Sequence, residues 1–147
     1  MGLRVLLLLL LATSGLLAGC SRTVEPGPTR LKDIAYHRTG GLMGAHDRID
    51  IAPDGAIAVT SWWLGTGVGK MTDEQVGDLT RAFAGWETLA NTYPAPPRVA
   101  GRFVIEIRHG EKTVAVSDAA RNVPFLFTHA RERMESLART ITGTKKR

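Results

Sequence analysis

Apolar and polar residues alternate in several short runs through the middle of the chain, which is the period of a strand with one buried face. The pattern predicts strands over residues 31–38, 46–51, 56–63, 101–109 and 112–117. An Asp54-Gly55 turn signal joins the second and third runs, and His109-Gly110-Glu111 joins the last two. Because strands connected by tight turns pair antiparallel, we expect two β-hairpins here.

Two other segments repeat apolar residues every three or four positions, as an amphipathic helix does. The first begins at a capping box, Thr72 to Gln75, and continues through the apolar stripe of Val76, Leu79, Phe83 and Trp86. The second follows Pro124, a favourable first-turn residue, and ends at Gly143. Its apolar positions are Phe127, Ala130, Met134, Leu137 and Ile141.

The order of these elements, βββαββα, predicts one α+β domain over residues 31–143. We expect an antiparallel sheet of about five strands, with both amphipathic helices packed on one face. Residues 65–70 are rich in glycine and residues 94–97 are rich in proline, so both segments are expected to be loops.

The first 19 residues have the parts of a secretory signal, with Arg4 ahead of an apolar run and small residues at the end. The segment closes on Leu17-Ala18-Gly19-Cys20, which resembles a bacterial lipoprotein signal. The resemblance implies that Cys20 is the first mature residue and carries a diacylglyceryl group. The alternatives are a transmembrane anchor, for which the apolar run is short, and a plain signal peptide cleaved near Ala18. A plain signal would leave a lone thiol in an oxidising compartment.

Residues 20–30 are polar and contain two prolines, so we expect a lipidated tether that reaches about 30 Å. Ser21 follows the lipidated cysteine, whereas Asp there usually signals retention in the inner membrane. This favours the periplasmic side of the outer membrane in a two-membrane bacterium. In a single-membrane cell the same signal predicts the outer face of the plasma membrane.

The formal net charge of +5 includes three cations in the basic tail, residues 144–147. The remainder of the domain is close to neutral, so the charge does not favour a nucleic-acid partner. The stretch before Lys70 superficially resembles a phosphate loop, but Leu64 stands where the Walker motif needs its first glycine, and Met71 replaces its Ser or Thr. The sequence therefore predicts no cofactor.

No catalytic or metal-binding constellation is evident among the residues that carry chemistry. The histidines His37, His46, His109 and His129 have no metal-ligand spacing, although His37 and His109 could meet on adjacent strands. Glu106 and Asp118 have no evident partner. We therefore predict that the protein is not an enzyme and has no small-molecule substrate.

Residues that could bind a protein partner occur in two places along the chain. The first is the turn Gly40, Gly41, Leu42, Met43 and Gly44, where apolar side chains stand between glycines. They either fold back on the core or face a partner. The second is Trp62-Trp63, because tryptophan is enriched in binding hot spots. The alternative for the latter is a loop tryptophan packed against Tyr93 or the proline segment.

The run Ile34-Ala35-Tyr36-His37-Arg38, followed by a Gly-Gly-apolar-x-Gly turn, resembles the protealysin-inhibitor (emfourin) family. The mid-chain helix, the later hairpin and the approach from Asp118 to Pro124 fit the same layout, from Ile34 to Ile141. The resemblance implies a small α+β protein that binds thermolysin-like zinc proteases. Leu42-Met43 departs from the aromatic-plus-small pair of that turn, and Trp62-Trp63 are an addition.

These features together predict a lipid-anchored envelope protein that binds another protein, with inhibition of a thermolysin-like metalloprotease as the specific form. A structural or assembly lipoprotein of the cell envelope, without a protease target, is the alternative. A hydrolytic or ligand-binding enzyme is a third possibility, and it would require a cleft near His37, Glu106, His109 or Asp118.

Overall fold

The computed structural model describes residues 30–97 and 99–143. The signal segment, Cys20, nearly all of the tether and the basic tail lie outside these residues. The elements follow in the order β1 (Ile34–Gly40), β2 (Ala45–Ile51), β3 (Ala56–Ser61), β4 (Gly65–Lys70), α1 (Asp73–Ala82), the 3-10 helix η1 (Trp86–Thr88), β5 (Thr92–Tyr93), β6 (Phe103–His109), β7 (Lys112–Ser117) and α2 (Phe125–Thr142).

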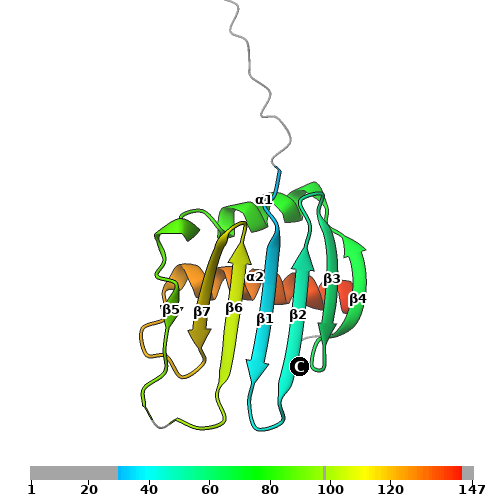
Figure 1. Cartoon of the computed structure of the whole chain (residues 1–147). Coiled ribbons are helices and arrows are strands. Elements are labelled where there is room, and N and C mark those ends of the chain that lie inside the picture. Colours follow the sequence, from blue (N-terminus) through cyan, green and yellow to red (C-terminus); the bar gives the residue numbers. More distant parts are fainter. Residues whose placement is uncertain (1–29, 98, 144–147) are drawn as a thin grey trace, which may run out of the picture.

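The strands form one seven-stranded sheet in the order β4-β3-β2-β1-β6-β7-β5 (Figure 1). The β1–β2, β2–β3, β3–β4, β1–β6 and β6–β7 pairs are antiparallel, whereas β5 pairs with β7 in parallel. The predicted α+β class is confirmed. The expectation of five antiparallel strands is wrong, because β4 and β5 extend the two edges and β5 makes the sheet mixed.

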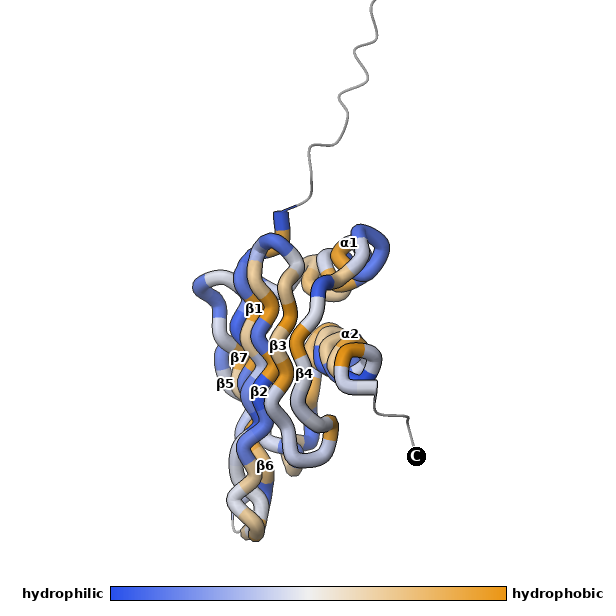
Figure 2. The backbone as a smooth tube through the Cα atoms, turned by 90° about the vertical axis from the view of Figure 1, so that its right-hand side faces the viewer, coloured by the Kyte–Doolittle hydropathy of each residue, from blue (hydrophilic) through white to orange (hydrophobic). Residues whose placement is uncertain are grey.

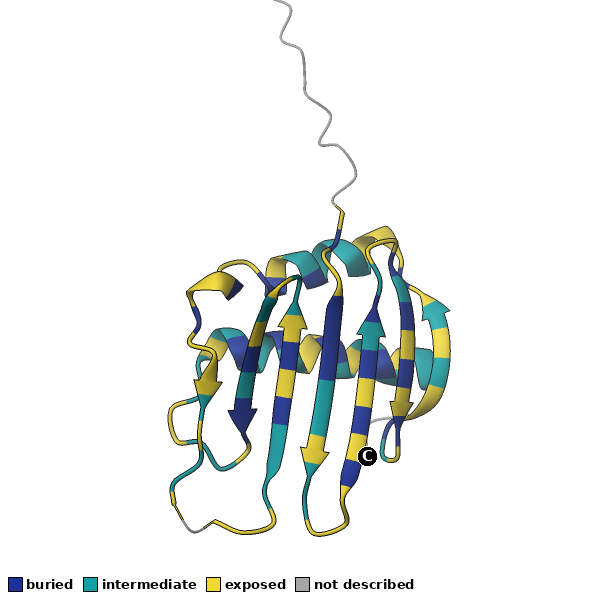
Figure 3. Ribbon diagram, in the orientation of Figure 1, coloured by how far each residue is buried: buried dark blue, intermediate teal, exposed yellow. Residues whose placement is uncertain are grey.

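Both helices lie on one face of the sheet, and Figure 2 shows them to the right of the strands, with α1 above α2. Alternation along the strands produces alternating buried and exposed residues, visible as bands in Figure 3. The buried positions face the helices, and this layer contains Tyr36, Ile49, Ile107, Val114, Leu79 and Met134, each fully buried. The opposite face of the sheet carries the polar positions of the same alternation.

Strand β4 occupies the glycine-rich segment that was expected to be a loop. It pairs with β3 along its whole length, from Ala56 opposite Lys70 to Ser61 opposite Gly65. Glycine disfavours strands, but here two of the glycines allow α2 to approach closely. A Cβ on Gly67 would lie 3.2 Å from the Ile141 carbonyl oxygen, and one on Gly69 would lie 2.7 Å from the Ile141 Cδ1.

The first helix begins where the sequence predicts but ends earlier. Thr72 is the N-cap, and both hydrogen bonds of its capping box with Gln75 are present. The apolar stripe was expected to be one helix through Trp86, yet α1 ends at Ala82. Gly85 has a φ of 84°, which breaks the helix and places Trp86 in η1. Trp86 is still buried in the core.

The remaining elements agree with the patterns apart from their ends. The Asp54-Gly55 hairpin is confirmed, with the Gly55 N–H donating to the Ala52 carbonyl at 2.9 Å. Strand β3 ends at Ser61, two residues before the expected end. Pro124 is the N-cap of α2 and lies just before its first turn, and Gly143 closes that helix in the left-handed conformation.

Candidate functional site

The turn between β1 and β2 holds two large apolar side chains in solvent. Leu42 is 92% exposed and Met43 is 93% exposed. The alternative that one or both fold back on the core is therefore wrong. Leu42 and Met43 are the most exposed of the large hydrophobic residues in the described part of the chain. The turn lies at the end of the sheet opposite α1 (Figure 1).

The base of this turn is fixed against the start of β6. The Gly41 N–H donates to the Arg102 carbonyl at 2.9 Å. Gly40 and Gly41 have φ values of 102° and 74°, which L side chains rarely adopt. A Cβ on Gly40 would lie 2.5 Å from the Arg102 carbonyl oxygen, and one on Gly41 would lie 2.5 Å from the Phe103 ring. The two glycines thus let the turn pack on β6 while its tip extends into solvent.

The two adjacent tryptophans lie in the β3–β4 turn, at the same end of the sheet as the β1–β2 turn (Figure 1). Trp62 is 72% exposed, whereas Trp63 is half-buried and packs against the core. The sequence left open which of the two is exposed. We call Leu42, Met43 and Trp62 together the turn surface.

A buried carboxylate holds the β3–β4 turn in place. Asp47 on β2 is only 2% exposed, and its Oδ1 accepts hydrogen bonds from the Ser61 hydroxyl at 2.7 Å and from the Trp62 N–H at 3.2 Å. Its Oδ2 accepts from Arg38 Nη1 at 3.4 Å. The Ser61 oxygen in turn accepts the N–H groups of Trp63 and Leu64. The backbone beneath Trp62 is therefore fixed by a satisfied polar network.

Cationic and aromatic side chains connect the two turns with α2. The Arg38 guanidinium carbon lies 3.8 Å from the centre of the Phe103 ring and 5.5 Å from that of Trp63. Arg139 of α2 lies 5.6 Å from the same Trp63 ring. Such cation–π contacts are favourable when partly desolvated. The alternative that these tryptophans pack against Tyr93 is wrong, because Tyr93 lies at the opposite edge of the sheet.

The residues considered for catalysis do not converge. His37 lies opposite Glu106 in the β1–β6 pairing and faces the side of the sheet without helices. His109 lies opposite Ile34 on the helix face, where its ring stacks on Phe83 at 4.7 Å. His37 and His109 therefore do not meet. Within residues 30–97 and 99–143, no group of three His, Cys, Asp or Glu residues is placed to hold a metal ion.

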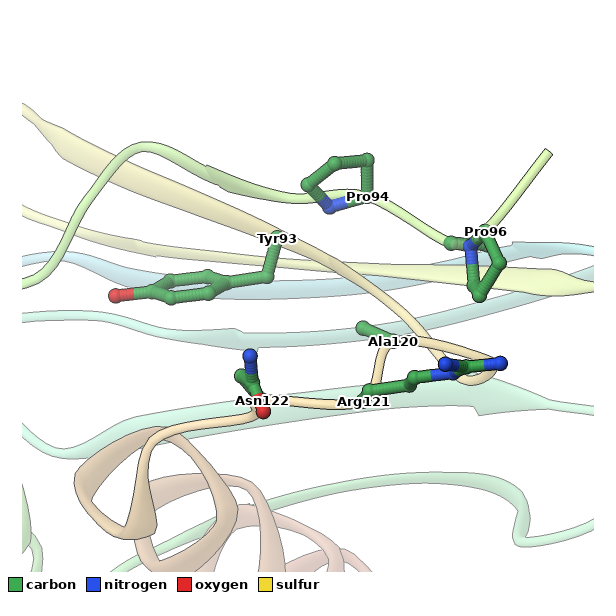
Figure 4. A pocket seen from close by; sticks show the side chains of 7 residues that line it. Tyr93, Pro94, Pro96, Ala120, Arg121 and Asn122 are labelled. Carbon is green, nitrogen blue, oxygen red and sulfur yellow. The ribbon is translucent and has the colours of Figure 1, made fainter.

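A cleft of about 350 Å³ lies at the β5 edge of the sheet. Figure 4 shows Tyr93 and the prolines that follow it on one side, and the loop that leads to α2 on the other. Its lining residues are Tyr93, Pro94, Ala95, Pro96, Ala120, Arg121 and Asn122. None of them belongs to the candidate set predicted from the sequence, and none is part of the turn surface.

Comparison with known proteins adds no identification, since no protein family and no curated protein matches the chain. None of the helices that the structure describes is long and apolar enough to cross a membrane. The candidate site therefore depends on geometry alone. The sequence predicted Leu42, Met43 and Trp62 as candidates for partner binding, but it did not predict that Asp47, Arg38 and Ser61 support them.

Proposed function

We propose that this protein is a lipid-anchored module of the cell envelope that binds another protein through the turn surface. One observation carries the proposal: Leu42 and Met43 are both more than nine-tenths exposed at the tip of a turn whose base is rigid. Leaving two apolar side chains in water gives the folded chain no burial energy, whereas a partner that covers them gains about 2 kcal/mol for each.

The support beneath the surface favours a binding role over a chance exposure. Trp62 stands on a turn held by Asp47, and Leu42 and Met43 stand on a turn packed against Phe103. A partner would therefore meet an ordered surface and would lose little conformational entropy in ordering it. Exposed aromatic and apolar anchors on a rigid base are typical of interface hot spots.

The position of the turn surface suits a protein anchored at its N-terminus. The described chain begins at Arg30 beside α1, and β1 runs from there to the opposite end of the sheet (Figure 1). Seven strand residues span roughly 20 Å. A lipid on Cys20 would thus be joined to the end of the sheet opposite the turn surface, which leaves that surface open to a partner. This arrangement supports a partner in the periplasm or outside the cell, according to the membrane that holds the lipid.

The resemblance of residues 34–44 to the protealysin-inhibitor family makes a thermolysin-like zinc protease the specific partner that we propose. Inserting the turn into the cleft of such a protease would bury Leu42 and Met43. Leu42 and Met43 differ from the family's usual turn residues, so we expect this chain to prefer a different protease from those that the family inhibits. If a pull-down with this protein recovered an envelope assembly complex and no protease, the structural alternative would be favoured.

The direct test is a protease inhibition assay with the chain from Ser21 onwards. Peptide cleavage by thermolysin and by thermolysin-like proteases from bacterial envelopes is measured at rising concentrations of the protein. We expect saturable inhibition that weakens at least tenfold when Leu42 and Met43 are both changed to Ser. Val68→Thr is the matched control, because Val68 is 82% exposed on β4 and outside the turn surface. Equal inhibition by all three proteins would remove the turn from the proposal.

A further inference from the structure

A second cleft lies at the end of the sheet that carries the turn surface. It is on the helix side, between the strands and α2. Its volume is about 320 Å³. We call it the α2 cleft, and the side chains that matter in it are Arg38, Trp63, Phe103, Asp118, Arg131 and Glu135. Two of these are aromatic and four are charged, so the cleft offers both apolar walls and polar groups. The sequence singled out only Trp63 and Asp118 from this set.

The basic groups at this cleft outnumber the carboxylates that are paired with them. Glu135 lies 3.8 Å from Arg131 and 3.5 Å from Arg139, so one carboxylate serves two guanidinium groups. The same carboxylate accepts the Tyr36 hydroxyl at 3.2 Å. Burial, and then the neighbouring Glu135, raises the pKa of Tyr36, so this hydroxyl stays a donor. Glu135 is therefore shared between two guanidinium groups, while Asp118 supplies a second negative charge in the lining.

Two buried N–H groups at the cleft have no hydrogen-bond partner among the described residues. They are Nε1 of Trp63 and Nε of Arg131, and the latter lies 3.8 Å from Glu135 Oε1, which is an ion-pair distance and too long for a hydrogen bond. Buried donors are almost always paired, and an unpaired one disfavours the folded state. The Arg131 side chain is 33% exposed, so its guanidinium group can meet a ligand with a small adjustment. Both side chains line the α2 cleft, so an acceptor with two oxygens can meet both donors once the two side chains turn toward it.

We propose that the α2 cleft binds a carboxylate ligand, whose oxygens accept hydrogen bonds from Arg131 and Trp63. The body of the ligand would lie against Trp63 and Phe103, so an aliphatic or aromatic acid fits the walls. A guanidinium group matches a carboxylate in planar, two-point geometry. Asp118, exposed in the lining of the cleft, opposes binding by like charge. The inference holds whether or not the turn surface binds a protein.

The same chemistry is found in free small acids and in the C-terminal carboxylate of a peptide. The test uses the chain from Ser21 onwards, which keeps the whole described core from Leu31 to Ala138. The probes are N-acetylleucine, its amide, and a leucine-ending hexapeptide with either a free or an amidated C-terminus. The measurement is the ¹H–¹⁵N signal of the Trp63 indole during titration, assigned with Trp63→Phe.

We expect the free acids to move the Trp63 indole signal in a saturable manner, while the amides leave it unchanged. Tighter binding of the free-acid peptide than of N-acetylleucine would assign the site to a protein C-terminus, whereas equal affinity would assign it to small acids. Absence of a saturable shift, or equal shifts from acids and amides, would overturn the inference.

Variants identify the groups that recognise the carboxylate. Arg131→Gln is expected to weaken binding of N-acetylleucine about tenfold, because a charge-assisted hydrogen bond is lost. Asp118→Asn is expected to tighten it, because a like charge is removed. Arg133→Gln is the matched control, since Arg133 is an exposed arginine of α2 outside the lining of this cleft. Equal effects of Arg131→Gln and Arg133→Gln would mean that overall charge, and not the cleft, attracts the acid.

Discussion

The turns at the two ends of the sheet differ in the side chains that they expose. At the α1 end, the β2–β3 turn is polar, and its Gly55 is buried beside Met71 and Val76. At the other end, the β1–β2 turn raises Leu42 and Met43 into solvent. Both turns use glycines with positive φ, so backbone geometry does not require the apolar tip. The β1–β2 turn thus carries apolar side chains that the folded chain leaves uncovered, whereas the β2–β3 turn does not.

The two ends also differ in the burial of the carboxylate that supports each turn. Asp54 at the α1 end is exposed, and its pKa is lowered chiefly by a hydrogen bond from the Ala56 N–H. Asp47 at the other end is buried and accepts three hydrogen bonds from different segments. A buried carboxylate in such a network costs desolvation, and removing it would leave its buried donors unpaired. Changing each carboxylate therefore tests whether the turn-surface end is the more constrained.

The largest expected effect comes from Asp47→Ala. It leaves Arg38, Ser61 and the Trp62 N–H without their acceptor, and we expect a loss of about 3 kcal/mol in the free energy of unfolding. Asp54→Ala, the matched change at the other end, is expected to have a much smaller effect. Urea unfolding of the two variants and of the unchanged chain measures both values. Similar losses for the two substitutions would contradict the contrast between the ends.

A smaller effect is expected from adding a methyl group within the β1–β2 turn. Gly41→Ala combines a left-handed φ with a contact on the Phe103 ring, so we expect a loss of about 2 kcal/mol. Gly44→Ala has a φ of 63° but no atom within 4 Å of the new Cβ, and a loss of about 1 kcal/mol is expected. Thermal and urea unfolding compare them. If Gly41→Ala left the free energy of unfolding unchanged, the turn would not be fixed on β6.

The smallest expected effect is a pH dependence at the α1 end. Burial lowers the pKa of His109, with a further contribution from the nearby Lys32. Its buried Nδ1 has no partner among the described residues. The unfolded chain, with a histidine pKa of about 6.5, then binds the proton more readily than the folded one. Stability should therefore fall as the pH drops through 6.5 and level off below the lowered pKa.

The measurement is the urea midpoint at several pH values between 5 and 8. His109→Gln should lose this component while keeping the pH dependence that arises from other groups. The difference between the two chains isolates His109. Identical pH profiles would show that the imidazole is solvated and that this end does not depend on its protonation.

The sequence was sufficient to predict the α+β class, the β2–β3 and β6–β7 hairpins and the starts of both helices, because each has a local chemical signal. The capping box at Thr72 and the Asp54-Gly55 turn are examples of signals confined to a few residues. Strand β4 was missed because its glycines carry no strand signal, and the close approach of Ile141 is visible only in the fold. Strand β5, with two residues, is too short for any period.

The site was predicted in part for similar reasons. Leu42, Met43 and Trp62 are conspicuous in sequence, since large apolar residues stand between glycines or side by side. The sequence does contain a signal for Asp47. It lies two and four residues before Ile49 and Ile51, so in a strand it falls on the same buried face. Arg38 likewise shares the face of Ile34 and Tyr36. Arg131 and Glu135 form an i, i+4 ion pair that the sequence of the helix already offers. Their position beside Trp63 depends on how α2 crosses the sheet, which no local pattern encodes.

The most direct test of the account is photo-crosslinking in cells that produce the full chain. A benzophenone-bearing phenylalanine analogue replaces Met43 in one variant and Val68 in another, since both positions are exposed apolar sites. The account predicts a discrete protein adduct from position 43, lost when Leu42 is also changed to Ser, and none from position 68. Mass spectrometry of the adduct would name the partner. No adduct from position 43, or the same adduct from both positions, would contradict the claim that the turn surface is where this protein binds.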